Sequence, residues 1–343
     1  MFHSRCRLAR LMLLAGCLSI LGYTSNALSD EVNVYSYRQP FLIKPMFDVF
    51  TRQTGIKVNS VFAKKGLVER LKSEGRNSPA DLIFTTDIGR LDAGLSAGVT
   101  QAVDSSVLSD NIPAEFRDPD GHWFGLTSRA RIIVTSRERI KPGQITSYED
   151  LADANLQAGL CTRSGKHSYM IALTASIIAH AGEAAAKDWL NGMKGNLARK
   201  PQGNDRAQVK AIHAGECDVA VINSYYMGNM VSDEEQSEWA AAVDIVFPNQ
   251  ADRGTHMNIS GMSLTRHAPN KDNAIQLMEF LASELAQKMY AEQNFEYPVN
   301  PQIPPSGLLQ SWGEFKYDPL PLADIARHRA TAVRLVDEVG YDG

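Results

Sequence analysis

The sequence predicts an α/β protein of two lobes, each a sheet with helices on its faces. Short apolar runs typical of strands alternate with segments of helical period along most of the chain, which is the pattern of parallel β-α-β units. The chain has 343 residues, of which 44% are hydrophobic and 22% are charged. This length is enough for two lobes or domains rather than one.

The N-terminus has the pattern of a secretory signal peptide. Three arginines precede an apolar run of about 13 residues, and small residues follow before the first acid, Asp30. The run is shorter than the ~20 residues that span a membrane. We therefore expect a mature protein released into the periplasm. Cys17, in the segment LAGC, raises the alternative of a lipoprotein acylated at this residue, but hydrophobic sequence continues beyond it.

Charge and motif content exclude several classes of function. Without the signal peptide, 32 basic residues stand against 39 acidic ones, a net charge of −7. No basic stripe is evident, so we expect no nucleic-acid partner. The sequence has no phosphate-binding loop, nucleophile elbow, zinc-protease motif or CxxC pair. We expect no enzyme, since an exported hydrolase on this scaffold would need an activated nucleophile.

The mature chain begins with a strand–helix series that implies a parallel sheet. The predicted elements are strands at 32–37, 56–62 and 81–86 and helices at 42–54 and 66–73. Gly55 ends the first of these helices.

A long strand at 129–136 leads into a second series of strands and helices. Its predicted elements are strands at 156–162 and 217–223 and helices at 168–182, 185–193 and 207–215. A further strand at 256–265 and a helix at 270–283 lead back toward the first series. No Gly/Ser-rich or Pro-rich linker separates the two series, so we expect strands that cross between the lobes.

These elements divide the chain into a signal peptide and two lobes. We assign residues 1–29 to the signal peptide, 30–130 plus 254–305 to the first lobe, and 131–253 plus 306–343 to the second. Small ligands commonly bind between two such rigid bodies. A small-molecule site in the interlobe cleft is therefore expected.

Two cysteines remain in the mature chain, Cys161 and Cys217. Both lie in apolar segments with the character of strands. In an exported protein, a lone pair of this kind favours a disulfide over a zinc site. Two buried free thiols are the alternative, and a thiol nucleophile at Cys161 is disfavoured by its apolar surroundings.

Tyrosines gather where predicted strands give way to helices. Tyr225 and Tyr226 directly follow a buried strand, Tyr169 begins a helix, and Tyr35 and Tyr37 close the first strand. The carboxyl ends of parallel strands line the ligand crevice in open sheets. A single tyrosine there usually serves amphipathic packing, but an adjacent pair with a third nearby favours a cluster of ligands.

A trio of phenolates in an exported protein suits ferric ion. Phenolate oxygen is a hard donor for a hard trivalent cation, and three of them cancel its charge. Because free tyrosine has a pKa of about 10, the metal must displace the protons, and binding should weaken in acid. Carbonate or another small anion would complete the coordination, held by an arginine fork. Arg38 lies beside the first strand's end, and Ser168 begins a helix whose N–H groups would help.

Five blocks of sequence carry a family likeness over nearly the whole mature chain. They are VNVYSYRQ, SPADLIFTTDIGRL, GECDVAVINSYYMG, GTHMNISGMSLTRHAPN and EYPVNP. In these blocks the chain resembles the periplasmic ferric iron-binding proteins of ABC importers, the bacterial transferrin-like group. The resemblance implies a type II periplasmic binding protein fold, with mixed sheets flanked by helices and two crossing hinge strands. It also implies an inner-membrane ABC permease as partner for a protein that we expect to be a monomer.

The resemblance also implies roles for individual residues. Tyr169, Tyr225 and Tyr226 match the family's tyrosine ligands, and Arg38 matches the arginine that holds carbonate in anion-using members.

This chain departs from the pattern in the first lobe. It has Gln39 where many relatives have histidine, and Thr86 where some have a glutamate ligand. An anion or water is therefore favoured on that side of the ion. Tyr37 is a further candidate as a fourth phenolate, and Gln39 is a weaker one.

A different cargo is the main alternative. An organic or oxyanionic solute, such as a polyamine, thiamine or sulfate, would use the tyrosines as stacking walls and Arg38 as a clamp. The sequence also leaves open whether iron arrives as the bare ion or as a small ferric chelate.

Overall fold

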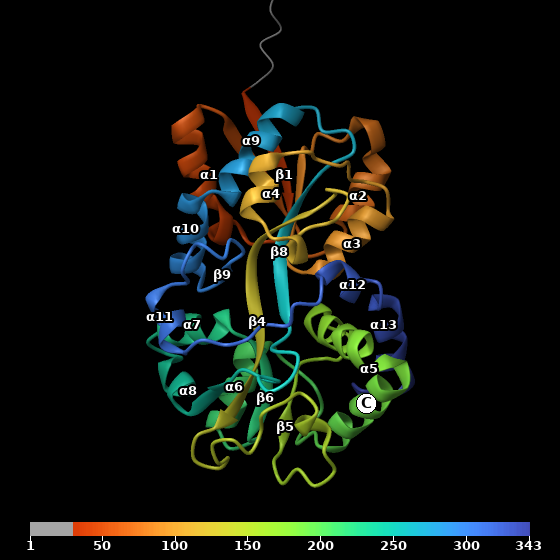
Figure 1. Cartoon of the computed structure of the whole chain (residues 1–343), viewed down its shortest axis with the longest axis vertical. Coiled ribbons are helices and arrows are strands. Elements are labelled where there is room, and N and C mark those ends of the chain that lie inside the picture. Colours follow the sequence, from red (N-terminus) through yellow and green to blue (C-terminus); the bar gives the residue numbers. More distant parts are fainter. Residues whose placement is uncertain (1–29) are drawn as a thin grey trace, which may run out of the picture.

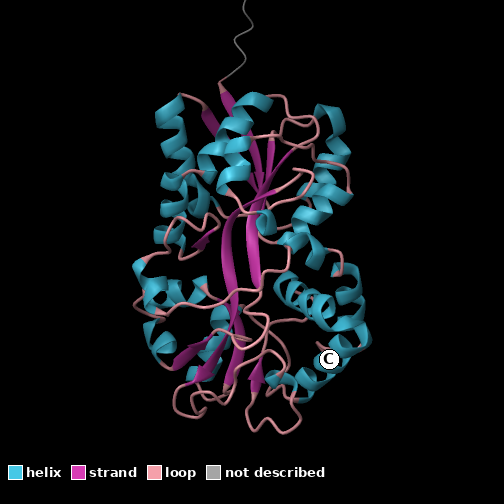
Figure 2. Cartoon of the chain, in the orientation of Figure 1, coloured by secondary structure: helices cyan, strands magenta, loops and turns pink. Residues whose placement is uncertain are grey.

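The computed structural model describes residues 30–343. The predicted signal peptide and Cys17 lie outside the described residues. Figure 1 shows an elongated molecule of two halves stacked along the long axis, and strands β4 (Phe124–Ser136) and β8 (Met257–Leu264) run between them. In both halves helices flank a central group of strands (Figure 2). The predicted α/β fold class is confirmed.

The upper half in Figure 1 holds the N-terminal elements and two returning helices. Its strands are β1 (Glu31–Ser36), β2 (Lys57–Phe62), β3 (Leu82–Thr85) and β9 (Tyr297–Pro298). Its helices are α1 (Pro40–Thr54), α2 (Leu67–Glu74), α3 (Ile88–Ser96), α4 (Ser106–Asn111), α9 (Lys271–Ala282) and α10 (Glu284–Asn294). Helix α1 has proline at its first position and ends at Gly55, which takes the left-handed conformation with φ 78°.

The lower half holds the second series and the C-terminal helices. Its strands are β5 (Leu160–Cys161), β6 (Val219–Asn223) and β7 (Val243–Val246). Its helices are α5 (Ser168–Gly195), α6 (Asp205–His213), α7 (Tyr225–Val231), α8 (Ser237–Ala241), α11 (Gly307–Ser311), α12 (Leu322–Ala326) and α13 (Arg329–Glu338). Single 3₁₀ turns cover Gly75–Asn77, Ala114–Phe116 and Asp150–Ala152.

One mixed sheet passes through both halves in the order β2-β1-β3-β8-β4-β6-β5, with β7 and β9 also paired to β4. Strand β4 pairs antiparallel with β8 through its first part and with β6 and β7 through its last part. Every residue of β4 and β8 is buried. These two strands are therefore the crossing connections that the sequence predicted, whereas the predicted residue bounds of the lobes stay a prediction.

Alternation along β4 divides its side chains between two faces. Successive side chains of a strand point to opposite sides, so Thr127, Arg129 and Arg131 share one face. Arg129 lies opposite Asn258 of β8, and Arg131 lies opposite Asn223 of β6. These three polar residues thus follow one another on one face of β4, across the junction between the two halves.

Some elements agree with the prediction and several differ. The two helices predicted at 168–182 and 185–193 are confirmed as the two parts of α5, which is kinked at Gly182, whose φ of 85° and ψ of 170° are not helical. The long strand begins at Phe124 rather than at 129, because its first part pairs with β8. Helices α3, α4 and α10 and the strand β7 were not predicted from the sequence.

Helix α5 is the one helix among residues 30–343 that is long and apolar enough to cross a membrane by length and composition. Its apolar window is 56% buried inside the fold. This burial, like the break at Gly182, is typical of a core helix.

A disulfide joins Cys161 of β5 to Cys217, two residues before β6. The two Cα atoms are 5.9 Å apart, and both side chains are buried. Strands β5 and β6 pair in parallel, with Cys161 opposite Ala220. The bond therefore reinforces the pairing of two strands that lead directly to α5 and α7.

Candidate functional site

Three tyrosine side chains meet at the ends of β5 and β6. Tyr225 and Tyr226 are the first two residues of α7, and their ring centroids are 4.3 Å apart. Tyr169 is the second residue of α5, and its hydroxyl lies 3.2 Å from that of Tyr225. All three are partly buried. We call these residues the tyrosine cluster; the sequence singled out each of them, and the structure brings them together.

The environment of the cluster favours protonated phenols in the absence of a cation. Burial raises the pKa of Tyr225 well above its usual range, and the neighbouring Tyr169 and Tyr226 raise it further. Burial, followed by the charge of Tyr169, raises the pKa of Tyr226 to about 12. A cation that binds to these oxygens must therefore displace protons.

Three guanidinium groups surround Tyr169. The Cζ atoms of Arg129, Arg131 and Arg163 lie 5.7, 5.8 and 5.0 Å from the centre of its ring. Sequence reasoning missed all three. A signal was present in the segment RARIIV, because charged residues inside a strand that is otherwise apolar are rarely buried without a partner or a task.

Asp205 neutralises part of this positive charge. Its carboxylate accepts hydrogen bonds from Arg131 Nη1 at 2.8 Å, from Arg163 Nη1 at 2.9 Å and from the Asn223 N–H at 2.8 Å. Burial by itself would raise the pKa of the Asp205 carboxyl, but the two guanidiniums hold it below its ordinary value. A single carboxylate thus serves two arginines, and the group keeps a net positive charge.

Arg129 has no carboxylate partner within residues 30–343. It donates through Nη1 to Ser260 Oγ at 3.0 Å and through Nη2 to the backbone oxygen of Thr86. Its side chain is buried, with an exposed fraction of 1%. Both partners are neutral, so its charge is available to an anion beside the tyrosine cluster.

Arg38, by contrast, already binds a carboxylate. Its Nη2 lies 2.7 Å from Glu296 Oε2, and its Nη1 lies 3.1 Å from Oε1. Nη1 also donates to Ser260 and, at 3.4 Å, to Thr127 Oγ1. Burial would lower the pKa of Arg38, but the paired carboxylate raises it. Glu296 therefore occupies the fork that the sequence assigned to carbonate, and sequence reasoning gave Glu296 no role.

The weaker candidates, Tyr37 and Gln39, lie at the starts of two helices of the first half. The Tyr37 hydroxyl accepts hydrogen bonds from the backbone N–H groups of Leu67, at 2.9 Å, and Val68, at 3.1 Å, at the start of α2. In the structure the Tyr37 oxygen thus caps a helix, and its role as a fourth phenolate stays a prediction. Gln39 is exposed at the start of α1.

Helix α5 begins at Ser168, as predicted, but its N-terminus is partly occupied. The Tyr169 N–H donates to the side chain of His167 at 3.2 Å. Burial lowers the pKa of His167 to about 3, so its imidazole is neutral and accepts this hydrogen bond. An anion at this end of α5 would therefore have to use the remaining N–H groups.

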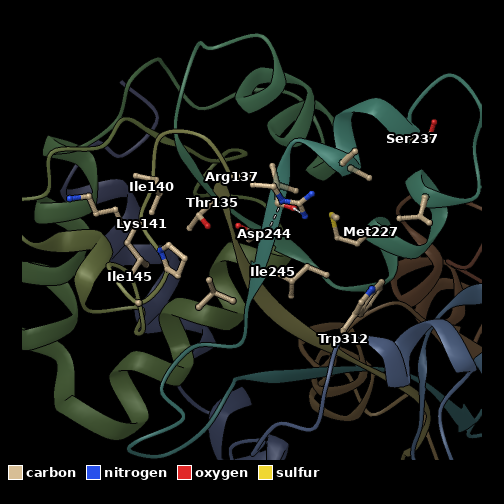
Figure 3. Close-up of a pocket in the computed structure, with 17 residues that line it drawn as sticks. Thr135, Arg137, Ile140, Lys141, Ile145, Met227, Ser237, Asp244, Ile245 and Trp312 are labelled. Carbon is tan, nitrogen blue, oxygen red and sulfur yellow. Dashed lines mark hydrogen bonds and ion pairs between the residues drawn. The ribbon is translucent and has the colours of Figure 1, made fainter.

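Two further observations bear on other sites. No group of three or more His, Cys, Asp and Glu side chains in the described part of the chain is placed to hold a metal ion. A cavity of about 770 Å³ lies between β4, β7, α7 and α8, and Figure 3 shows Thr135, Asp244, Met227 and Trp312 around it. None of the three tyrosines lines this cavity.

Comparison with known proteins places this geometry in a family context. The family model described as bacterial extracellular solute-binding protein matches residues 77–312. The chain is 41% identical to iron uptake protein A1 of Synechocystis, over 91% of this chain and 88% of that protein.

Solved structures are similar as well. The apo ferric ion-binding protein A of Pasteurella haemolytica is 52% identical, with a TM-score of 0.87, over 92% of this chain and 99% of that chain. A Trichodesmium protein solved in complex with iron and citrate is 41% identical, with a TM-score of 0.87, over 91% of this chain and 99% of that chain.

Replacement of Asp205 tests the charge balance of the site. We expect Asp205→Asn to lower the free energy of unfolding by about 3–5 kcal/mol at neutral pH, because two guanidiniums lose their buried counter-charge. The folded-state pKa of Asp205 is depressed, so its contribution is complete above its ordinary value of 3.8 and is lost as the pH falls below it. Urea unfolding, measured from neutral pH down to about pH 3, should therefore show a decreasing difference in the free energy of unfolding between wild type and Asp205→Asn. A difference that does not change with pH would contradict this assignment.

Proposed function

The chain belongs to the family of bacterial extracellular solute-binding proteins, and on that basis we propose that it captures ferric ion at the tyrosine cluster and delivers it to an ABC permease. Its relatives include an iron uptake protein at 41% identity and solved ferric ion-binding proteins at up to 52% identity. The protein works in the periplasm as a carrier rather than as an enzyme.

The observation that carries the proposal is the contact among three phenols from two helix N-termini. The hydroxyl oxygens of Tyr169 and Tyr225 lie 3.2 Å apart, and the ring of Tyr226 lies tilted by 33° against that of Tyr225. Once deprotonated, three phenolates at this spacing would repel one another strongly unless a cation lay between them. A trivalent hard cation provides that charge and accepts such oxygens as ligands.

A small anion completes the proposed site. Counted with Fe(III) and three phenolates, the charges of Arg129, Arg131, Arg163 and Asp205 sum to a surplus of two positive charges. Arg38 and Glu296 cancel each other. Carbonate or a carboxylate-bearing anion would offset the surplus, and a similar protein has been solved with iron and citrate. We assign the anion to Arg129, with Arg38 beside it through the shared Ser260 hydroxyl.

Tyrosine replacement tests the proposal directly. Iron-loaded wild type should be coloured, because phenolate-to-iron(III) bonds absorb visible light, and its thermal unfolding should shift upward with ferric citrate. Tyr225→Phe should lose the colour and weaken iron binding by more than about 100-fold, since it deletes a ligand outright. Tyr35→Phe is the matched control, because that hydroxyl bonds Glu74 rather than the cluster. A colourless wild type, or a fully coloured Tyr225→Phe, would refute the assignment; merely weakened binding would favour a stacked organic solute.

Iron uptake should release protons. Tyr225 and Tyr226 have raised pKa values and are protonated at neutral pH, so coordination by the cluster must free at least two protons. Affinity should therefore fall as the pH is lowered, by roughly tenfold per proton per pH unit. Proton release measured with an indicator dye in weak buffer checks this; uptake without release would mean that the phenols are not ligands.

Anion dependence should trace to Arg129. Removal of bicarbonate should weaken iron binding by wild type, and Arg129→Gln should bind weakly whether or not bicarbonate is present. Arg129→Lys keeps the charge but not the two-pronged guanidinium. Its iron binding should therefore depend on bicarbonate more than that of Arg129→Gln but less than that of wild type. Titration of iron-free protein by visible absorbance, with and without bicarbonate, provides the measurement. If iron binding by Arg129→Gln depended on bicarbonate as fully as that of wild type, Arg38 rather than Arg129 would be the residue that binds the anion.

A further inference from the structure

We propose that the segment Asn294–Glu296 holds the two halves together, and we call it the latch. Its outer residues are fixed to the first half, and Phe295 between them positions helix α7 of the second half, which carries Tyr225 and Tyr226. The role of α7 as an iron-binding element rests on the function proposed above, whereas the latch itself rests on contacts that need no iron. The segment links the end of α10 to β9.

The contact between Phe295 and Gly228 is the core of the latch. Gly228 lies in α7, one helical turn after Tyr225. A Cβ atom placed on Gly228 would overlap both Cβ and Cγ of Phe295. The ring therefore occupies the space from which any other side chain at position 228 would start. Only glycine permits so close an approach of α7 to this ring.

The backbone of Phe295 has an unusual conformation that orients the ring for this contact. Its φ is 55° and its ψ is 35°, the left-handed conformation, and Asn249 is the one other non-glycine residue with positive φ in the described part of the chain. An aromatic residue seldom adopts this conformation unless its surroundings fix it. Here it ends α10 and turns the ring toward α7.

The residues on either side tie the segment to the first half. Asn294 Nδ2 donates to the backbone oxygen of Leu42 in α1 at 3.1 Å, and Glu296 forms the buried ion pair with Arg38. Both side chains are buried. Because Phe295 lies between two anchored neighbours, it has little freedom to follow α7 if the halves move apart.

Helices α10 and α7 belong to different halves, and they contact each other beside this segment. Separation of the halves would withdraw the ring from Gly228 and leave the first turn of α7 without its cover. That turn carries Tyr225 and Tyr226. The latch should therefore hold the two tyrosines in place and slow the escape of a bound ion.

A double-mutant cycle tests the latch. Gly228→Ala should release iron to a competing chelator on the order of tenfold faster, because interface changes act mainly on dissociation. Phe295→Ala should do the same, since the ring is lost. If the two act through one contact, the double variant should release iron no faster than Phe295→Ala alone. The proposal would be overturned if Gly228→Ala increased the rate of iron release equally in wild type and in Phe295→Ala. It would also be overturned if Gly228→Ala changed this rate in neither protein.

The control is Gly195→Ala, since Gly195 is also helical and has no atom within 4 Å of a built Cβ. Alanine favours a helix over glycine, so a general effect on helices would appear in this variant too. The visible band of each loaded variant reports whether tyrosine coordination is intact.

A readout without iron separates the latch from the proposed function. Hydrogen exchange of the α7 amides in iron-free protein should be faster in Gly228→Ala and Phe295→Ala and unchanged in Gly195→Ala. This result would support the latch even if wild type took up no iron. Unchanged exchange in all three variants would overturn it, whatever iron does.

Discussion

The excess of buried positive charge around three phenols is the constraint on which the site depends. Arg38, Arg129 and Arg131 are buried, and Arg163 is partly buried, yet the carboxylates paired with this group are those of Asp205 and Glu296. Charge buried without compensation is costly. The surplus lowers the cost of forming phenolates and of admitting an anion. In the function proposed above, loss of protons, binding of the anion and binding of the cation would therefore be parts of one equilibrium.

Strand β4 supplies much of this arrangement. Its apolar residues are buried in the core. Three polar residues of its other positions form hydrogen bonds: Thr127 accepts one from Arg38, Arg129 donates to Ser260, and Arg131 donates to Asp205. The same strand pairs with β8 in one half and with β6 in the other. A single element thus connects the framework of the fold with the electrostatics of the tyrosine cluster.

The site residues that could be predicted from the sequence are those marked by their position relative to a predicted strand. Tyr169, Tyr225 and Tyr226 could be singled out because each follows a strand, and the ends of strands converge by geometry. Arg163, Asp205 and Glu296 were missed, since their ion-pair partners are 42 to 258 residues away and no local pattern indicates the pairing. Tyr37 shares its position at a strand end with the cluster, but the sequence did not reveal that its hydroxyl accepts hydrogen bonds from the start of α2.

The disulfide gives this arrangement a dependence on where the chain folds. Cys161 and Cys217 join the two strands that precede the helices carrying Tyr169 and Tyr225. Thiols stay reduced in the cytosol and are oxidised in the cell envelope. If the chain is exported as proposed, this disulfide forms only after translocation. The redox state of the compartment, and not the amino-acid sequence alone, would then determine when the two strands become covalently joined.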